Sequence, residues 1–193
     1  MNSYSTFPSR GNSLNTYSGI NFYITSPQYD EIFLSDIAHA LSMICRANGH
    51  FKYFYSVAQH SINCYREAVA RGYSPNIQIA CLFHDASEAY ISDIVRPAKE
   101  YLPDYLELEE AIQNKIYEKF CLEDLSEADT KNIAEIDDTV LWHEFNELHN
   151  MPMWCAKPIK YADIDLRLRD MAEVESEFIS LANDIYLNEM LST

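Results

Sequence analysis

Apolar residues recur every three or four positions along most of the chain, which predicts a succession of amphipathic helices. The segment 34–48 has this spacing, and Ser35 is placed to cap the start of its helix. Residues 56–72 form a second such segment, with Ser56 as the expected cap and Gly72 just beyond the end. We therefore expect two helices in the first third of the chain.

The same pattern continues towards the C-terminus. A third helix is expected to start at Pro75 and to run through "PNIQIACLFHDASEAY", whose all-round apolar middle predicts a buried central helix. Another is expected to begin near Ser126, where Ser-x-x-Asp precedes an apolar series. Two further apolar stripes comprise Leu108, Ile112, Ile116 and Phe120, and then Met171, Val174, Phe178, Leu181 and Ile185.

Residues 1–34 lack this periodicity. They are rich in Ser, Asn, Tyr and Gly, which favours an irregular or short-strand arm packed on the rest of the molecule. The chain has only four glycines and no internal repeat, so residues 35–193 are expected to form one domain. The predicted fold is all-α, a bundle of about six helices with an N-terminal arm.

Composition narrows the range of partners. The net charge of −16 opposes binding to a nucleic-acid duplex, because affinity for the phosphate backbone comes from Lys and Arg. Apolar stretches are too short for a bilayer span, and the N-terminus lacks the features of a signal peptide. We therefore expect a cytoplasmic protein without membrane contacts. The five scattered cysteines contain no Cys-x-x-Cys pair, which predicts reduced and mostly buried thiols.

A histidine and an aspartate, His84 and Asp85, directly follow the apolar run 79–83. Burying either residue without a partner costs several kcal/mol, so a nearby group must satisfy both. Glu88 lies three and four residues further on, which would place all three side chains on one face of the predicted helix. Three ionisable groups beside an apolar core call for a cation or an equally demanding network of polar contacts.

Two further residues offer the ligands that a metal would need. His60 lies in the middle of the second predicted helix, and Asp137 lies among apolar positions of the fifth. Each residue by itself is more simply explained as a hydrogen-bonded or salt-bridged side chain. Together with His84 and Asp85 they supply two imidazoles and two carboxylates, which suit Mn, Fe, Co or Zn better than calcium.

The order of these motifs resembles the HD-domain phosphohydrolase superfamily, named for its metal-binding His-Asp pair. The segments "DIAHALSMICRANGH", "FYSVAQHS" and "LFHDASEAYISDIVRPAKEYLP" are similar to small nucleotide hydrolases, such as bacterial 5′-deoxynucleotidases and phage dATP triphosphohydrolases. The resemblance covers roughly residues 17–150 and includes several separate motifs in the same order.

The resemblance implies a role for each matching residue. It makes four side chains the ligands of a divalent metal (Co, Mn, Zn or Fe, with Mg as a further option), namely His60, His84, Asp85 and Asp137. Asp138 is the alternative ligand, and the resemblance favours Asp137 because Glu144 follows it seven residues later.

The resemblance also implies the remaining catalytic groups. Glu88 and Asp93 match the acidic residues that orient the attacking water and handle its proton. Arg46 and Lys99 match the basic residues that hold phosphate. Ala47 stands where the family often has a bulky aromatic residue, which leaves sugar and base selection open.

These roles predict a metal-dependent phosphohydrolase that acts on a small nucleotide substrate. We expect a dNTP triphosphohydrolase that releases deoxynucleoside and triphosphate, with a 5′-deoxynucleotidase as the alternative. A cyclic nucleotide or oligonucleotide phosphodiesterase and a non-catalytic nucleotide-binding protein are further alternatives. We also expect a homo-oligomer, a dimer or a hexamer.

Overall fold

The structure is a computed structural model that describes residues 13–151 and 155–190 of the chain. It is mostly helical, and this confirms the predicted all-α class. The first part of the predicted N-terminal arm, residues 1–12, lies outside the described residues. Within the described part, no helix is both long and apolar enough to cross a membrane.

Six helices have nine or more residues within the described part of the chain, in agreement with the predicted bundle. They are α1 (Leu34–Met43), α2 (Val57–Ala70), α3 (Pro75–Phe83), α6 (Pro103–Lys119), α7 (Glu127–Leu148) and α8 (Met171–Met190). The shorter elements are β1 (Ser13–Asn15), β2 (Asn21–Tyr23), η1 (Tyr29–Glu31), η2 (Arg46–Gly49), α4 (Glu88–Ile91) and α5 (Arg96–Lys99).

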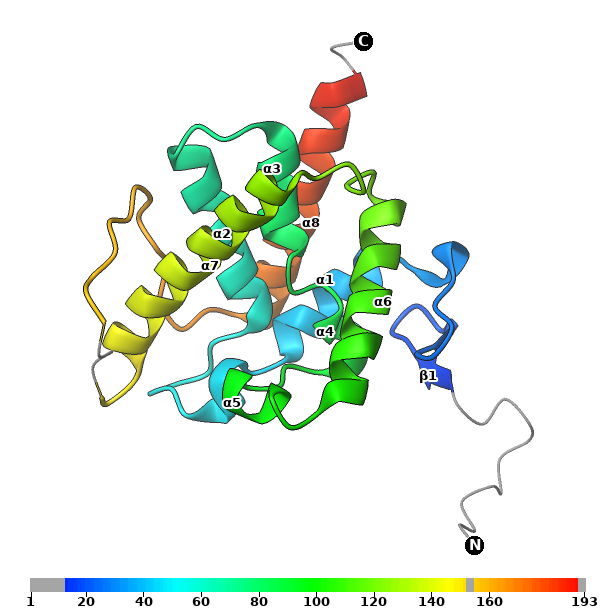
Figure 1. Cartoon of the computed structure of the whole chain (residues 1–193), viewed down its shortest axis with the longest axis horizontal. Helices are drawn as coiled ribbons and strands as arrows, with labels where there is room; N and C mark the ends of the chain where they lie inside the picture. The colour runs from blue at the N-terminus through cyan, green and yellow to red at the C-terminus, as the bar shows by residue number, and fades with distance from the viewer. Residues whose placement is uncertain (1–12, 152–154, 191–193) are drawn as a thin grey trace, which may run out of the picture.

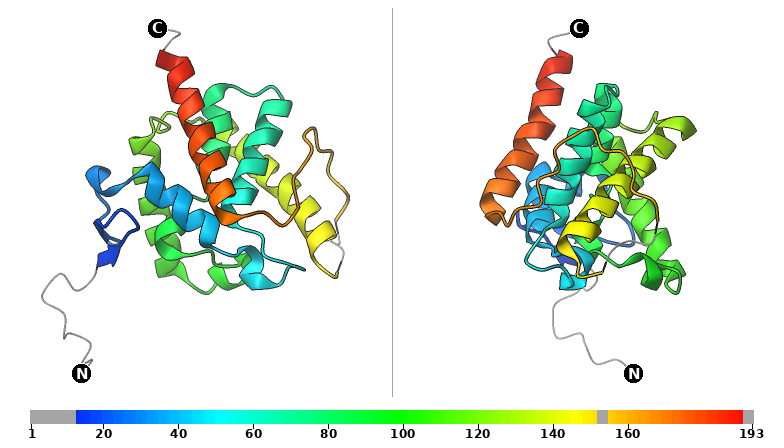
Figure 2. Two further views of the ribbon diagram at one scale, coloured as in Figure 1. Left: turned by 180° about the vertical axis from the view of Figure 1, so that it is seen from behind. Right: turned by 90° about the vertical axis from the view of Figure 1, so that its left-hand side faces the viewer.

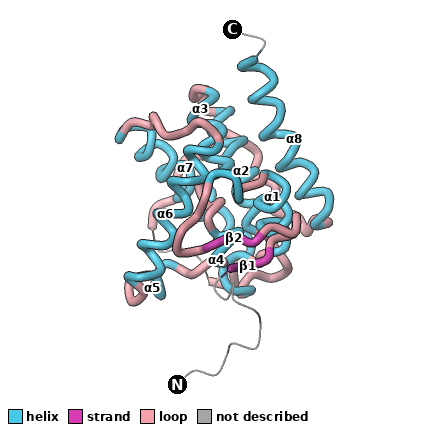
Figure 3. Tube along the Cα trace, turned by 90° about the vertical axis from the view of Figure 1, so that its right-hand side faces the viewer, coloured by secondary structure: helices cyan, strands magenta, loops and turns pink. Residues whose placement is uncertain are grey.

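The central layer consists of α2 and α3, which pack closely against each other (Figure 1). Helix α8, with α1 beside it, covers one side of this layer, and α7 covers the other side (Figure 2). The two strands pair antiparallel with Leu14 opposite Phe22, and this small hairpin lies close to α4 (Figure 3). The sandwich of helices therefore places the middle of α2 between α7 and α8.

Apolar contacts between the layers hold the bundle together. Ile112 and Ile116 of α6 are fully buried, and each contributes about 1.5–3 kcal/mol of transfer free energy relative to an exposed position. Phe83, the last residue of α3, stacks on Phe120 and meets Phe178 of α8 edge to face. Most of the predicted stripes on α6 and α8 thus face the core, but Met171 at the start of α8 is exposed, and the side chain of Ile185 lies outside the described residues.

Two helix starts follow the expected capping chemistry. Ser56 caps α2, because its hydroxyl accepts a hydrogen bond from the backbone N–H of Gln59. Ser126 and Asp129 form a reciprocal capping box at the start of α7. Gly72 follows α2 with a φ of 75°, the left-handed conformation that glycine adopts at low cost.

The structure corrects two predicted helices. The first ends at Met43 rather than near residue 48 and begins with Phe33 as its N-cap, so Ser35 lies inside the first turn and is not the cap. Cys45 pairs with Ser56 in an isolated β-bridge, which holds the backbone extended beyond α1. This backbone pairing with a distant residue has no signal in the helical periodicity.

The third predicted helix is also shorter than expected. α3 ends at Phe83, a turn covers residues 84–87, and Glu88 starts the separate helix α4. The prediction that His84, Asp85 and Glu88 share one face of a single helix is therefore wrong. The break leaves His84 and Asp85 at the end of a buried helix.

Candidate metal centre

Three helices bring the predicted ligands together at the centre of the bundle. His60 comes from the middle of α2, where it is fully buried. His84 and Asp85 follow the end of α3, and Asp137 comes from α7. The packing of α2 against both α3 and α7 explains why residues so far apart in sequence meet (Figure 1).

The side-chain nitrogen and oxygen atoms of these residues converge on one point. The Nε2 atoms of His60 and His84 are 3.2 Å apart. Asp137 Oδ1 lies 3.0 Å from His60 Nε2 and 3.8 Å from His84 Nε2, while Asp85 Oδ2 lies 3.7 Å and 3.3 Å from the same two nitrogens. The structure thus assembles all four predicted metal ligands in one cluster.

Hydrogen bonds on the far side of each imidazole fix the tautomer of the neutral ring. His84 Nδ1 lies 2.8 Å from the carbonyl oxygen of Cys81, which can only accept, so Nδ1 carries a hydrogen. His60 Nδ1 lies 2.8 Å from Glu144 Oε1 and donates to that carboxylate. When these rings lose their Nε2 protons, as metal binding would require, both Nε2 lone pairs are directed towards the same point, as in imidazole ligands of a metal.

One ligand oxygen has no hydrogen-bond donor of its own. Asp137 Oδ1 is buried and accepts no hydrogen bond, although His60 Nε2 lies 3.0 Å away. A buried carboxylate oxygen without a donor is costly, and a bound cation would remove that cost. Two lone pairs and an unsatisfied carboxylate oxygen around one point therefore fit a divalent metal.

Glu144 supports this cluster from behind. Its carboxylate is fully buried and accepts hydrogen bonds from Tyr55 Oη at 2.8 Å, Arg46 Nε at 3.1 Å and His60 Nδ1 at 2.8 Å. These donors outweigh the effect of burial and lower the pKa of Glu144, so it remains a charged acceptor. Because Glu144 lies two helical turns beyond Asp137, one face of α7 supplies both groups.

The electrostatic field of the cluster favours cations. Burial alone would lower the pKa of His84, but Asp85 and Asp137 outweigh it and raise that pKa well above its ordinary value. Burial would raise the pKa of each aspartate, yet the imidazoles hold both pKa values below the ordinary range. The field that gives these imidazoles a high proton affinity would also attract a divalent cation.

A cavity of about 200 Å³ opens beside the cluster and contains the other predicted site residues. Its lining includes Arg46, Glu88, Asp93 and Lys99, together with both aspartate ligands and Ala47. The structure thus gathers all eight predicted site residues, since the two remaining ones, His60 and His84, lie directly behind Asp85 and Asp137.

Glu88 differs from the other carboxylates of the site. It is 3% exposed, and its Oε2 atom is buried without a hydrogen-bond partner. Burial, reinforced by the charges of Asp85 and Asp93, raises the pKa of Glu88 well above its ordinary value. Glu88 is therefore suited to carry and transfer a proton near neutral pH.

The basic residues of the site are already partly neutralised. Arg46 is 7% exposed, and its Nη1 donates to Asp85 Oδ2 at 3.2 Å, so it supports a ligand besides lining the cavity. Lys99 donates to Glu109 Oε1 at 2.5 Å and lies 3.7 Å from Glu88 Oε1. Burial opposes the charge of Lys99, but Glu109 outweighs it and raises the Lys99 pKa.

The structure distinguishes Asp137 from the alternative ligand Asp138. The side chain of Asp138 is 61% exposed and accepts a hydrogen bond from Arg96 Nη1 at 2.8 Å. Arg96 Nη2 donates to Asp137 Oδ2 at 2.7 Å, which leaves Oδ1 directed at the imidazoles. The arrangement therefore places Asp137 in the cluster and Asp138 outside it.

Sequence reasoning missed four residues of the site. Arg96 of α5 and Glu109 of α6 bind site residues from helix positions that have no distinctive spacing, and Tyr55 is recognisable only through its contact with Glu144. Cys64 lies one helical turn after His60, a spacing that places both side chains on one face of α2. This four-residue spacing from His60 was the sequence signal that could have identified Cys64 as part of the site.

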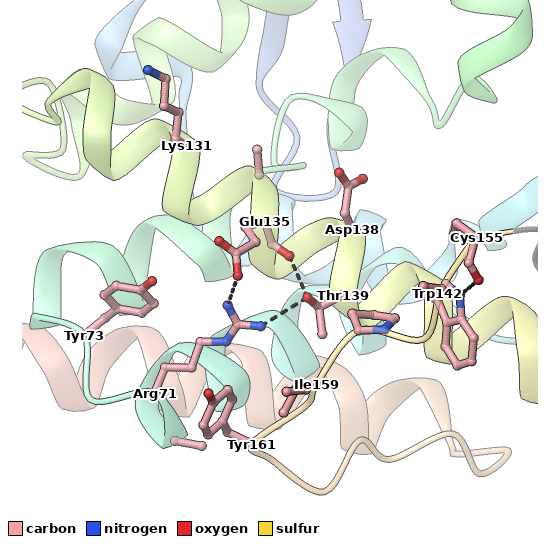
Figure 4. Close-up of a pocket in the computed structure, with 14 residues that line it drawn as sticks. Arg71, Tyr73, Lys131, Glu135, Asp138, Thr139, Trp142, Cys155, Ile159 and Tyr161 are labelled. Atoms are coloured by element: carbon pink, nitrogen blue, oxygen red, sulfur yellow. Dashed lines mark hydrogen bonds and ion pairs between the residues drawn. The ribbon is translucent and has the colours of Figure 1, made fainter.

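A larger pocket, of about 1020 Å³, lies on the outer side of α7 (Figure 4). Its arginine, Arg71, is already bound, since its Nη1 donates to Glu135 and its Nη2 to Thr139. Among the described residues, the cluster of imidazole, thiol and carboxylate groups that could hold a metal lies elsewhere, around His60. We therefore place the candidate functional site at the smaller cavity.

Comparisons with known proteins identify relatives of this chain. It is 44% identical over 109 residues to YfdR, an uncharacterized protein of Escherichia coli (strain K12), a match covering 56% of this chain and 58% of the relative. It is 33% identical over 129 residues to an uncharacterized protein of Rhodobacter capsulatus, covering 64% of this chain and 65% of the relative. The chain thus spans less than two thirds of each relative's length. No family model matches it.

Proposed function

We propose that this protein is a metal-dependent phosphohydrolase of the HD type that acts on deoxynucleotides. One observation carries the proposal: two imidazoles and two aspartates converge within 3.0–3.8 Å beside a cavity that holds acidic and basic side chains. Phosphoryl transfer needs this combination, because charge must be stabilised and a water must be activated at fixed positions.

In this proposal the side chains of the site have separate roles in metal binding and proton transfer. A divalent ion held by His60, His84, Asp85 and Asp137 would act as a Lewis acid towards water and a phosphoryl oxygen. Glu88, with its raised pKa, exchanges a proton with the attacking water or the leaving oxygen, and Asp93 on the same cavity wall orients that water.

The basic residues bind the phosphate. Lys99 lines the cavity and is held there by Glu109, so its ammonium group is positioned before substrate arrives. Arg46 lies at the inner end of the cavity, where it neutralises Asp85 and offsets the charge of the phosphoryl group. The cavity of about 200 Å³ is smaller than the roughly 300–1,000 Å³ of typical ligand pockets, so it would hold the phosphoryl end of a nucleotide rather than the whole molecule.

Within this class we favour a deoxynucleoside triphosphate over a monophosphate. The distal phosphates would bind Lys99, and part of that binding energy would align the α-phosphorus with the attacking water. The products would be deoxynucleoside and intact triphosphate. The cytoplasm is the compartment that supplies such a substrate.

Product chromatography tests this choice. Full-length protein stripped with a chelator and resupplied with Mn²⁺, Co²⁺, Zn²⁺, Fe²⁺ or Mg²⁺ is given dATP or dAMP. We expect a higher kcat/KM for dATP than for dAMP, and Lys99→Ala should reduce the ratio of these two values. Lys131→Ala is the matched control, because Lys131 lines the other pocket. Inorganic phosphate as the sole early product from dAMP, with dATP inert, would contradict the triphosphate proposal and support a 5′-deoxynucleotidase.

A further inference from the structure

Cys64 lies against the candidate metal centre on the side away from the cavity. It follows His60 by one helical turn on α2, is 1% exposed, and its Sγ atom lies 3.5 Å from His60 Nε2. Ligand atoms of His60, Cys64, His84 and Asp137 all lie within 4.8 Å of one another. Cys64 is therefore part of a compact group of four metal-binding side chains.

Two of the separations between these atoms match a tetrahedral site that contains a thiolate. Ligand bonds of about 2.3 Å to sulfur and about 2.05 Å to nitrogen give tetrahedral separations of about 3.6 Å for S···N and about 3.3 Å for N···N. The corresponding distances here are 3.5 Å for Cys64 and His60 and 3.2 Å for the two imidazoles. Asp137 Oδ1, which is buried without a hydrogen bond, is the fourth atom.

Two ligand sets consequently share His60, His84 and Asp137. Asp85 completes one set from the cavity side, because it lines the cavity and binds Arg46 there. Cys64 completes the other from the buried side. The shared residues are fixed by other contacts, so either set can form without rearrangement of the helices.

We propose that Cys64 binds the metal as a thiolate and makes this centre selective for Zn²⁺ or Co²⁺ over Mg²⁺ and Mn²⁺. A thiolate is a soft ligand, which the first two ions accept and the harder ions do not favour. Binding forms the metal–sulfur bond and releases the thiol proton to solvent, without oxidation of either partner. The proposal rests on the metal centre of the proposed function and adds the identity of its ion.

Cobalt spectroscopy tests the thiolate directly. Chelator-stripped, full-length protein is titrated with one equivalent of Co²⁺ while the near-ultraviolet sulfur-to-cobalt charge-transfer band is recorded. We expect the band in the unaltered chain and in Cys81→Ser, and its loss in Cys64→Ser together with at least an about tenfold weaker affinity for Co²⁺. Cys81 is a matched control because it is equally buried, while its backbone carbonyl rather than its thiol contacts His84.

A second measurement avoids any substitution. X-ray absorption of the Zn²⁺-loaded, unaltered chain should show one sulfur at about 2.3 Å among nitrogen and oxygen ligands. A shell without sulfur, a missing cobalt band, or a band that persists in Cys64→Ser overturns the role of Cys64 while the metal centre stands. Failure of the unaltered chain to bind either ion overturns both this inference and the metal centre of the proposed function.

Discussion

Glu88 occupies surroundings that disfavour its charged form. It is almost fully buried, and Asp85 and Asp93 add negative charge close by, so its pKa is raised well above the ordinary value. Because the folded state binds the proton more tightly than the unfolded state, Glu88 destabilises the fold increasingly as pH rises from the ordinary glutamate range through the folded pKa. A carboxyl group in a cavity whose surroundings raise its pKa and destabilise the fold is typical of a functional site.

Glu88→Gln should therefore stabilise the metal-free protein while it impairs catalysis. We expect a gain in unfolding free energy on the order of 1 kcal/mol at neutral pH that shrinks towards pH 4, because the amide removes a buried charge. Turnover should fall about a hundredfold or more. Denaturant unfolding at several pH values and initial rates provide the two measurements.

Glu109→Gln serves as the control for that prediction. Glu109 is the hydrogen-bonded partner of Lys99, so its neutralisation should destabilise the protein rather than stabilise it. Equal stability of Glu88→Gln and the unaltered chain at neutral pH, or unchanged turnover, would contradict the assigned role of Glu88.

At the scale of single residues, sequence reasoning was most successful for groups that the motifs contain. The His84–Asp85 pair at the end of an apolar run indicated a buried polar site, and His60 and Asp137 offered two further ligands, which the resemblance assigned to the same metal and the structure brings together. Glu109 could not be predicted, because a surface-type helix position gives no sign that its side chain binds Lys99 of the neighbouring helix α5.

The helices α2, α3 and α7 bring the cluster together. The N-terminal cap of α7 tests whether the stability of this helix and the affinity for the metal can be separated. Ser126 and Asp129 form a capping box at an exposed position 11 residues before Asp137. Ser126→Ala should cost about 1 kcal/mol of stability and lower Tm by about 2–4 °C. Because the cap is three turns from the cluster, affinity for the metal should stay unchanged.

Ser126→Thr is the matched variant, since threonine retains a capping hydroxyl and should restore most of the lost stability. Thermal unfolding and a metal titration on the same samples measure both quantities. A large loss of metal affinity in Ser126→Ala would mean that the start of α7 controls the position of Asp137, contrary to this account.

At the scale of elements, periodicity predicted the helices but not their interruptions. The apolar stripes of α6 and α8 and the capping residues of α2 and α7 follow from local rules. The ends of α1 and α3 depend on contacts between distant segments, such as the bridge of Cys45 to Ser56. Those contacts form only when the bundle assembles, so local sequence patterns could not predict them.

For the whole molecule, a single ion would join the layers of the bundle. Its ligands come from α2, α7 and the turn after α3, so metal binding should stabilise the whole fold. At a free metal concentration of 100 times Kd the gain is about 2.7 kcal/mol, which corresponds to about 5–10 °C in Tm. Thermal unfolding with and without Co²⁺ measures this shift.

Two neighbouring substitutions make this prediction specific. Asp137→Asn should abolish most of the shift in Tm, whereas Asp138→Asn should retain it because Asp138 is exposed and outside the cluster. The same shift in both variants would show that the ion binds elsewhere on this acidic chain, which has a net charge of −16.

The most direct test of the central claim is the initial rate of dATP hydrolysis by chelator-stripped protein as metal is restored. We expect no hydrolysis without metal, recovery that saturates at one ion per chain, and the release of deoxyadenosine with triphosphate. Asp138→Asn should behave like the unaltered chain, and Asp85→Asn should remain inactive because an amide is a far poorer ligand than a carboxylate. Full occupancy by metal without hydrolysis of dATP or any other deoxynucleotide, or equal rates in Asp85→Asn and the unaltered chain, would contradict the account.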